Sequence, residues 1–288
     1  MSNSAVLSSS IAKKYWMALT GLFLCLFLVG HLIGNLQLIF KVGEEGRKAF
    51  NEYAYFMQTN IFIKIMSYIT YISILFHAVD GILLTIQNKK ARPINYAYNN
   101  QAANTATPAR MMAILGSIIL IFIATHMVNF WAKMHFGGLK LHTYELSMEG
   151  QMGPQKQQVY HTHTLSAQPI PEVEQIEVKN EIELYVKGSN LKVAETYKDL
   201  HSAVIAFFSG NDVHGTTGNK SALLAVILYT VSMLVLGFHL WHGFASAFQS
   251  LGVNHKRYTP IIQMFGKAFS VLVPFAFAII PILIYINR

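Results

Sequence analysis

The sequence predicts an all-α integral membrane protein with five transmembrane helices, and two observations support this fold class. First, 53% of the 288 residues are hydrophobic and only 12% are charged, and the charges gather between long apolar runs. Second, five runs reach the roughly 20 residues that a helix needs to cross the hydrocarbon core. The expected spans are residues 15–40, 61–87, 111–132, 221–250 and 260–286.

Charge and cysteine content exclude several functional classes. The residues before the first span are polar, and Lys13 and Lys14 lead straight into it, so we expect no cleaved signal peptide. The one cysteine, Cys25, permits neither a disulfide framework nor a cysteine-based zinc or iron–sulphur site within this chain. The net charge of +8 comes without a basic patch interleaved with aromatic residues, so no nucleic-acid partner is expected.

The distribution of lysine and arginine predicts the orientation. Three connections carry basic residues and no acidic ones: Lys13 and Lys14; Lys89, Lys90, Arg92 and Arg110; Lys256 and Arg257. The positive-inside rule places these on the cytoplasmic side, whereas the two connections with glutamates face outside. We therefore expect a multi-pass protein of the cytoplasmic (inner) membrane with a cytoplasmic N-terminus. Five spans put the C-terminus outside, although Arg288 alone would favour the inside.

This topology divides the chain into helices one to three (residues 1–135), an extracytoplasmic insert (136–219) and helices four and five (220–288). Within the insert, the run VEQIEVKNEIELYVKG alternates apolar and charged residues, which predicts one or two short strands. Helical spacing from Lys192 to Phe208 predicts a helix along the membrane surface. His161 and His163 form a His-x-His pair that we interpret as solvated loop residues rather than as metal ligands.

Each of the first four spans carries a histidine near mid-membrane: His31, His77, His126 and His239. At about 1.5 Å per residue from the cytoplasmic ends, His31 and His126 lie roughly 22 to 24 Å deep, and His77 and His239 roughly 13 to 18 Å deep. The histidines thus form two layers, separated by something on the order of 8 Å. The fifth span has no histidine and is predicted to be peripheral to this four-helix core.

Two imidazoles that face each other across a bundle can occupy the axial positions of a haem iron. Two such layers predict two haems, and small residues beside the histidines would leave room for the macrocycles: Gly30, Gly34, Gly81 and Gly243. Glycine also serves helix contact in membranes, so this signal is weak by itself.

Other interpretations of the histidines exist. A buried membrane histidine can simply hydrogen-bond to a neighbouring helix in an anchor that holds no cofactor, or it can line a metal or proton transport path. A transport path would be expected to bring intramembrane carboxylates near the histidines, yet Asp80 is the only acidic residue within a span. The histidine pattern therefore favours haem.

Five motifs carry a resemblance to a known family: MALTGLFLCLFLVGHLIGNLQL, FNEYAYFM, LFHAVDGILLT running into NKKARPINY, THMVNFW, and LGFHLWHGFASAFQSLG. With these motifs the chain resembles the five-helix, two-haem cytochrome b membrane anchor of succinate:quinone oxidoreductases (succinate dehydrogenase or fumarate reductase). The resemblance covers all five spans and leaves out the insert. It implies that His77 and His239 ligate the inner haem b, and His31 and His126 the outer one.

The resemblance also implies partners. A flavoprotein subunit oxidises succinate, an iron–sulphur subunit passes the electrons on, and both dock on the cytoplasmic face of the anchor. The anchor itself would not bind succinate; it would deliver electrons to a quinone, with menaquinone expected for the two-haem class. Fumarate-reducing members with a compensating proton path have a glutamate two residues before the helix-four ligand, where this chain has Gly237, which favours succinate oxidation.

Polar residues near the outer ligands are candidates for a quinone site, because a quinone needs groups that exchange protons with its oxygens. These candidates are Asn35, Gln37, Asn129 and Glu52. Hydrogen bonding between helices explains the two asparagines equally well. Arg92, with Lys89 and Lys90, is placed to pair with the propionates of the inner haem, or merely to set the topology.

Helix four contains two histidines, His239 and His242, and either could be the haem ligand. Aligning LGFHLWHGFASAF with LFHAVDGIL sets His239 on His77 and His242 on Asp80. We therefore expect His239 to be the ligand. Asp80 and His242 are expected to form a polar pair or to contact the haem edge, where they would tune the cofactor.

Overall fold

The computed structural model describes residues 9–91, 94, 100, 107–150, 153–163 and 169–287. It is mostly helical (69%), and five helices are long and apolar enough to span a membrane. These spans are α2 (Ser10–Phe40), α4 (Ile61–Lys90), the run Met112–Phe136, α10 (Ala222–Ser250) and α11 (Tyr258–Ile286). The third span is composed of α7 (Met112–His126), η1 (Met127–Trp131) and α8 (Ala132–Phe136), and the short α6 (Thr107–Arg110) precedes it. The five predicted spans are thereby confirmed to within a few residues at each end.

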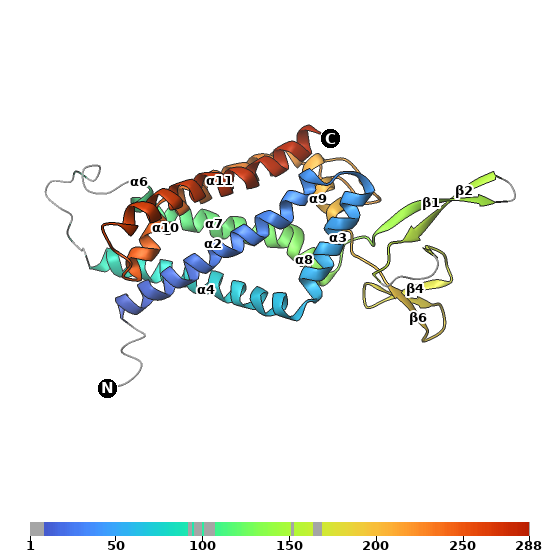
Figure 1. Cartoon of the computed structure of the whole chain (residues 1–288), viewed down its shortest axis with the longest axis horizontal. Helices are drawn as coiled ribbons and strands as arrows, with labels where there is room; N and C mark the ends of the chain where they lie inside the picture. Colours follow the sequence, from blue (N-terminus) through green and yellow to red (C-terminus); the bar gives the residue numbers. More distant parts are fainter. Residues whose placement is uncertain are drawn as a thin grey trace. The chain divides into compact units, whose positions relative to one another are not determined.

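The chain divides into two compact units. The first unit contains Met1–Ile33, Lys64–Thr125 and Ile227–Pro281, and therefore most of α2, α4, α7, α10 and α11. These helices run side by side (Figure 1). Apolar side chains hold α2 to α10, with Cys25, Leu240 and Phe244 forming a buried cluster.

The fifth span, predicted to be peripheral to the four-helix core, has the largest buried share of the five spans. In its most apolar stretch 39% of the residues are buried, against 22% in α2, α4 and α10 and 6% in the third span. The reason is close packing on α10: a Cβ atom at Gly237 would lie 3.0 Å from the Ser270 carbonyl oxygen, and one at Gly266 would lie 2.7 Å from the Phe244 ring. Gly237 thus has a packing role, and a glutamate there would collide with α11.

The second unit contains Gly34–Ile63, His126–Val226 and Ile282–Arg288. Helix α3 (Gly43–Thr59) has Glu44 and Glu45 in its first turn, where negative charges stabilise the N-terminus of a helix. Two three-stranded antiparallel sheets follow the third span. One consists of β1 (Thr143–Gly150), β2 (Gly153–Tyr160) and β3 (Ile170–Pro171), and the other of β4 (Ile176–Lys179), β5 (Glu183–Val186) and β6 (Lys192–Glu195). Tyr160, Ile170, Leu184 and Ala194 form the apolar core that the two sheets share.

The insert therefore contains more structure than the sequence predicted. The alternating run does form two strands, β4 and β5, as expected. The predicted helix from Lys192 is wrong in its first part, because these residues pair with β5 as strand β6. Helix α9 (Leu200–Ser209) begins only after Asp199, whose carboxylate caps it by accepting a hydrogen bond from the Ser202 N–H at 3.0 Å. Six of its ten residues are buried, so α9 packs against other parts of the second unit. Its place along the membrane surface stays a prediction.

Candidate functional site

The rings of His77 of α4 and His239 of α10 lie beside each other within the first unit, in an edge-on arrangement. Their ring centroids are 6.2 Å apart, and the ring planes make an angle of 70°. Two imidazoles that bind opposite sides of one metal through nitrogen–metal bonds of about 2.0 Å would have centroids roughly 6 Å apart. The spacing of this pair is thus suited to a shared metal centre.

One nitrogen of His77 is held by α2. Nδ1 lies 3.2 Å from the carbonyl oxygen of Met17 and 3.3 Å from Oγ1 of Thr20. A carbonyl oxygen only accepts hydrogen bonds, so Nδ1 carries the proton and Nε2 keeps its lone pair. Histidines that ligate metals are commonly held in this way, with the second ring nitrogen donating to a backbone carbonyl.

Small residues border both rings, but they are not the ones that the sequence suggested. A Cβ atom at Gly21 would lie 3.1 Å from Cε1 of His77, and one at Gly116 would lie 3.7 Å from Cε1 of His239. At Gly81 and Gly243 a Cβ atom would make only ordinary contacts with methionines, and at Gly30 it would meet nothing within 4 Å. Gly34 serves a different contact, because its Cβ would lie 2.7 Å from the ring of Tyr53 in α3.

The opposite ring lacks such support. Within the part of the chain that the structure describes, the buried Nδ1 of His239 has no hydrogen-bond partner. A buried polar atom left unpaired costs about 1–3 kcal/mol. Its partner would have to come from outside these residues. Two imidazoles with centroids 6.2 Å apart, one of them with its Nδ1 held by α2, are a donor set that fits a haem iron.

The other two predicted ligands lie in different units and are described separately. His31, in the first unit, stacks on Phe27 with centroids 5.3 Å apart and lies 5.7 Å from the ring of Phe277. His126, in the second unit, ends α7 and lies 5.4 Å from the ring of Phe130. The pairing of His31 with His126 stays a prediction from the sequence.

The expected polar pair of Asp80 and His242 is not formed. Both residues are partly buried, but among the described residues no hydrogen bond or ion pair joins them. They lie one turn or less from the ring pair along their helices, so contact with a haem edge stays a prediction. Arg92, the propionate candidate, lies outside the described residues.

The proposed quinone residues Asn35, Glu52 and Asn129 all belong to the second unit. Asn129 lies in η1, a π-helical turn that begins directly after His126. Such turns are rare and occur frequently at functional sites. Glu52 is partly exposed, and its Oε1 lies 3.8 Å from Nζ of Lys48. Gln37 accepts a hydrogen bond from Nζ of Lys41 at 3.3 Å.

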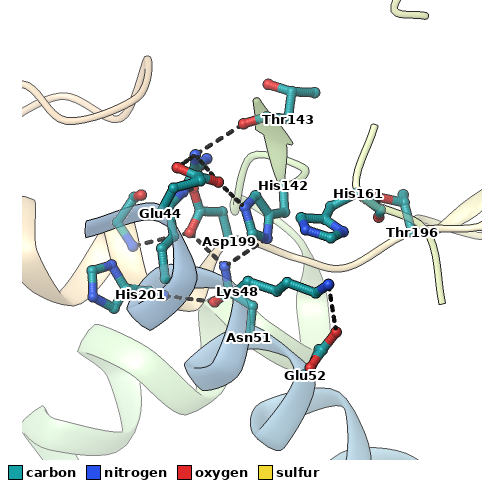
Figure 2. A network of polar contacts seen from close by, with 12 residues as sticks. Glu44, Lys48, Asn51, Glu52, His142, Thr143, His161, Thr196, Asp199 and His201 are labelled. Carbon is teal, nitrogen blue, oxygen red and sulfur yellow. Dashed lines mark hydrogen bonds and ion pairs between the residues drawn. The ribbon is translucent and has the colours of Figure 1, made fainter. Parts of the chain in front are cut away.

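A polar cluster in the second unit, buried except for the exposed Glu44, was not predicted. Figure 2 shows that it brings together side chains from α3, from the start of β1 and from the N-terminus of α9. Arg47 donates to Asp199, to Glu44 and to the Thr143 carbonyl oxygen. The cluster is made of Glu44, Arg47, Asn51, His142 and Asp199. Of these residues, the motif FNEYAYFM contains Asn51, but the motif did not predict its partners His142 and Asp199.

Charge and burial set the protonation of this cluster. Burial alone would raise the pKa of Asp199, but hydrogen bonds from Arg47 and Ser202 and the charge of Arg47 lower it to about 2. Burial lowers the pKa of His142, whose Nε2 lies 2.7 Å from Glu44. Burial also lowers the pKa of His201 to about 4. At neutral pH the cluster therefore holds the ionised carboxylate of Asp199 near a neutral His142.

His161 and His163 lie in the loop after β2, as we expected; His163 is exposed, whereas His161 is partly buried. The ring of His161 lies 4.9 Å from that of His142, and burial lowers its pKa to about 4. The ring of His163 lies 4.6 Å from that of Tyr55, and its Nδ1 is 3.4 Å from the Tyr197 hydroxyl. In the described ranges no group of three or more His, Cys, Asp or Glu side chains is placed to hold a metal ion.

Comparison of the chain with protein-family models, with curated proteins and with solved structures gives no match in any of the three.

Proposed function

We propose that this chain is the cytochrome b membrane anchor of a succinate:quinone oxidoreductase. In this role it holds two bis-histidine haems b and carries electrons from an iron–sulphur subunit to a quinone, with menaquinone as the expected acceptor. The five apolar helices support the membrane location. The ligand pairs are His77 with His239 and His31 with His126.

The observation that carries the proposal is the His77–His239 pair. The two imidazoles come from different helices, and their ring centroids are 6.2 Å apart. The sequence predicts both residues at the depth of the inner pair. His77 presents Nε2 because Nδ1 is engaged by α2. When bound, haem supplies one-electron redox chemistry; the residues of the chain orient its ligands and exclude water from it.

The remaining features of the proposal come from the sequence. The basic connections assign the N-terminus and the docking face of the flavoprotein and iron–sulphur subunits to the cytoplasm. Asn35, Glu52 and Asn129 are the candidate residues for quinone binding, and Arg92 is the candidate for a haem propionate. The glycine at position 237 is consistent with succinate oxidation, and it also serves helix packing.

An absorption spectrum of the purified protein tests the proposal. We expect cytochrome b bands after dithionite reduction and two haems per chain by pyridine haemochrome quantitation. His77→Ala or His239→Ala should remove one spectral component, and His31→Ala or His126→Ala should remove the other.

A dithionite-reduced spectrum without cytochrome b bands would refute the proposal. The histidine-lined metal or proton transporter would then be the next hypothesis, to be tested by ion flux in proteoliposomes. A protein with neither haem nor flux would be a structural anchor.

A further inference from the structure

Three residues of α2 contact or border the ring of His77. Met17 does so through its carbonyl oxygen and Thr20 through its hydroxyl, and Gly21 lacks the Cβ atom that would crowd the ring. We call these three residues the α2 cradle. Thr20 is buried, with 8% of its surface exposed. Its Oγ1 lies 2.7 Å from the Trp16 carbonyl oxygen and 3.3 Å from Nδ1 of His77.

The direction of these hydrogen bonds follows from counting protons. A hydroxyl has one proton to donate, and a backbone carbonyl of α2, which lies closer than His77, takes it. The lone pairs of Oγ1 are then free to accept from His77. Since the Met17 carbonyl oxygen also accepts at 3.2 Å, the Nδ1–H group of His77 is shared between two acceptors.

Gly21 makes this approach possible. A Cβ atom at this position would lie 3.1 Å from Cε1 and 3.5 Å from Nδ1 of His77, which is tighter than a normal side-chain contact. Any larger residue would force the ring away from α2 and lengthen both hydrogen bonds. The three cradle residues thus act on the same ring.

We propose that the α2 cradle positions His77 and makes it the more strongly donating ligand of the inner haem. Accepting a hydrogen bond from Nδ1–H raises the basicity of the ring, which favours the ferric state and lowers the reduction potential. No such acceptor faces Nδ1 of His239 among the described residues, so the two ligands are unequal. This inference depends on the proposed function, with Thr20 acting through His77 as a positioning residue.

The test replaces the hydroxyl by a methyl group of the same shape. In Thr20→Val we expect the midpoint potential of the inner haem to rise, and the g values of its ferric low-spin EPR signal to shift, while the outer haem keeps its wild-type values. Thr20→Ser should keep the wild-type potential. Gly21→Ala should change the EPR signal of the inner haem or cause its loss.

Thr70→Val is the matched control, because Thr70 is also buried and donates to a helix carbonyl, that of Met66, at 2.9 Å. It should leave the potential of the inner haem unchanged. If Thr20→Val does not assemble, Thr20→Ala removes the same hydroxyl.

The outcomes separate this inference from the proposed function. A wild-type protein without haem would refute the proposed function. Two haems in Thr20→Val with both potentials unchanged would refute the cradle alone. The inference would also be refuted if Thr20→Ser or Thr70→Val changed the midpoint potential of the inner haem as much as Thr20→Val does. Loss of only the inner haem in Thr20→Val, with retention in Thr20→Ser, would support it.

Discussion

Arg47 donates two hydrogen bonds to the same oxygen of Asp199, from Nε at 2.9 Å and from Nη2 at 2.5 Å. Both residues are almost fully buried, with 2% and 0% of their side chains exposed. The other oxygen of Asp199 accepts from Asn51 at 2.8 Å and from the backbone N–H of Ser202. This pair therefore ties α3 to the N-terminus of α9 within the second unit.

Asp199→Ala should strongly destabilise the second unit. Removing one partner of a buried pair typically costs about 3–5 kcal/mol, because the other charge stays buried without compensation. The measurement is thermal unfolding of the detergent-solubilised protein, combined with protease sensitivity of the insert. The control is Glu177→Ala, which breaks the exposed contact of Glu177 with Lys179 at 3.5 Å and should change stability by less than about 1 kcal/mol. Equal effects of the two substitutions would contradict the prediction.

Stability should fall as the pH drops from about 6.5 to about 4. His201 has a folded-state pKa lowered by burial to about 4, below the value of about 6.5 in an unfolded chain. In that window the unfolded state binds the proton and the folded state does not, so stability is greatest above the window and is lost within it. His161, with its pKa also lowered to about 4 by burial, acts in the same direction.

His201→Gln isolates one of these contributions. The slope of the unfolding free energy against pH gives the number of protons taken up on unfolding. We expect this number to be about one lower in the variant than in the wild type over that window. Unfolding temperatures measured at half-unit steps between pH 4 and pH 7 give the slope. A slope equal to that of the wild type would show that His201 titrates alike in both states.

Gly34→Ala should destabilise the contact between α2 and α3. The new Cβ atom would lie 2.7 Å from Cε1 and 2.8 Å from the hydroxyl oxygen of Tyr53. Overpacking of this kind costs about 1–3 kcal/mol. Shortening the opposing side chain in the double variant Gly34→Ala/Tyr53→Leu should recover part of the unfolding temperature. Failure of this rescue would mean that Gly34 is needed for another reason.

His239→Ala and His242→Ala should differ in haem content. We expect His239→Ala to lack the inner haem, because it removes one of the two neighbouring rings. His242→Ala should retain two haems and at most shift the spectrum or potential of the inner one. Haem quantitation of the two purified variants makes the comparison. The reverse result would assign the ligand role to His242.

Asn35→Leu, Asn129→Leu and Glu52→Gln should each lower quinone reduction by about tenfold or more, because the asparagines would hydrogen-bond to the quinone oxygens and Glu52 would exchange protons with them. Haem content must stay normal for the result to be informative. The measurement is the rate at which the reduced protein transfers electrons to a soluble menaquinone analogue. Unchanged rates in all three variants would remove these residues from the quinone site.

Hydropathy alone placed the five membrane spans, because crossing a hydrocarbon core demands about 20 apolar residues and this demand is local in the sequence. The same counting gave His77 and His239 similar depths, since the rise per residue of a helix is constant. In the structure these two rings are neighbours, with centroids 6.2 Å apart. Alternation of apolar and charged residues also located β4 and β5.

Only the tertiary structure decided which residues support these elements. Arg47 and Asp199 are 152 positions apart, and no periodicity relates them. The residues from Lys192 to Glu195 have a helical spacing of apolar side chains but form strand β6, because β5 provides their backbone hydrogen-bond partners. The glycines beside the rings, Gly21 and Gly116, were missed because each faces a histidine on another helix, and rotation about the helix axis is set by packing. The sequence by itself thus determined the five spans, whereas long-range packing decided what each histidine contacts.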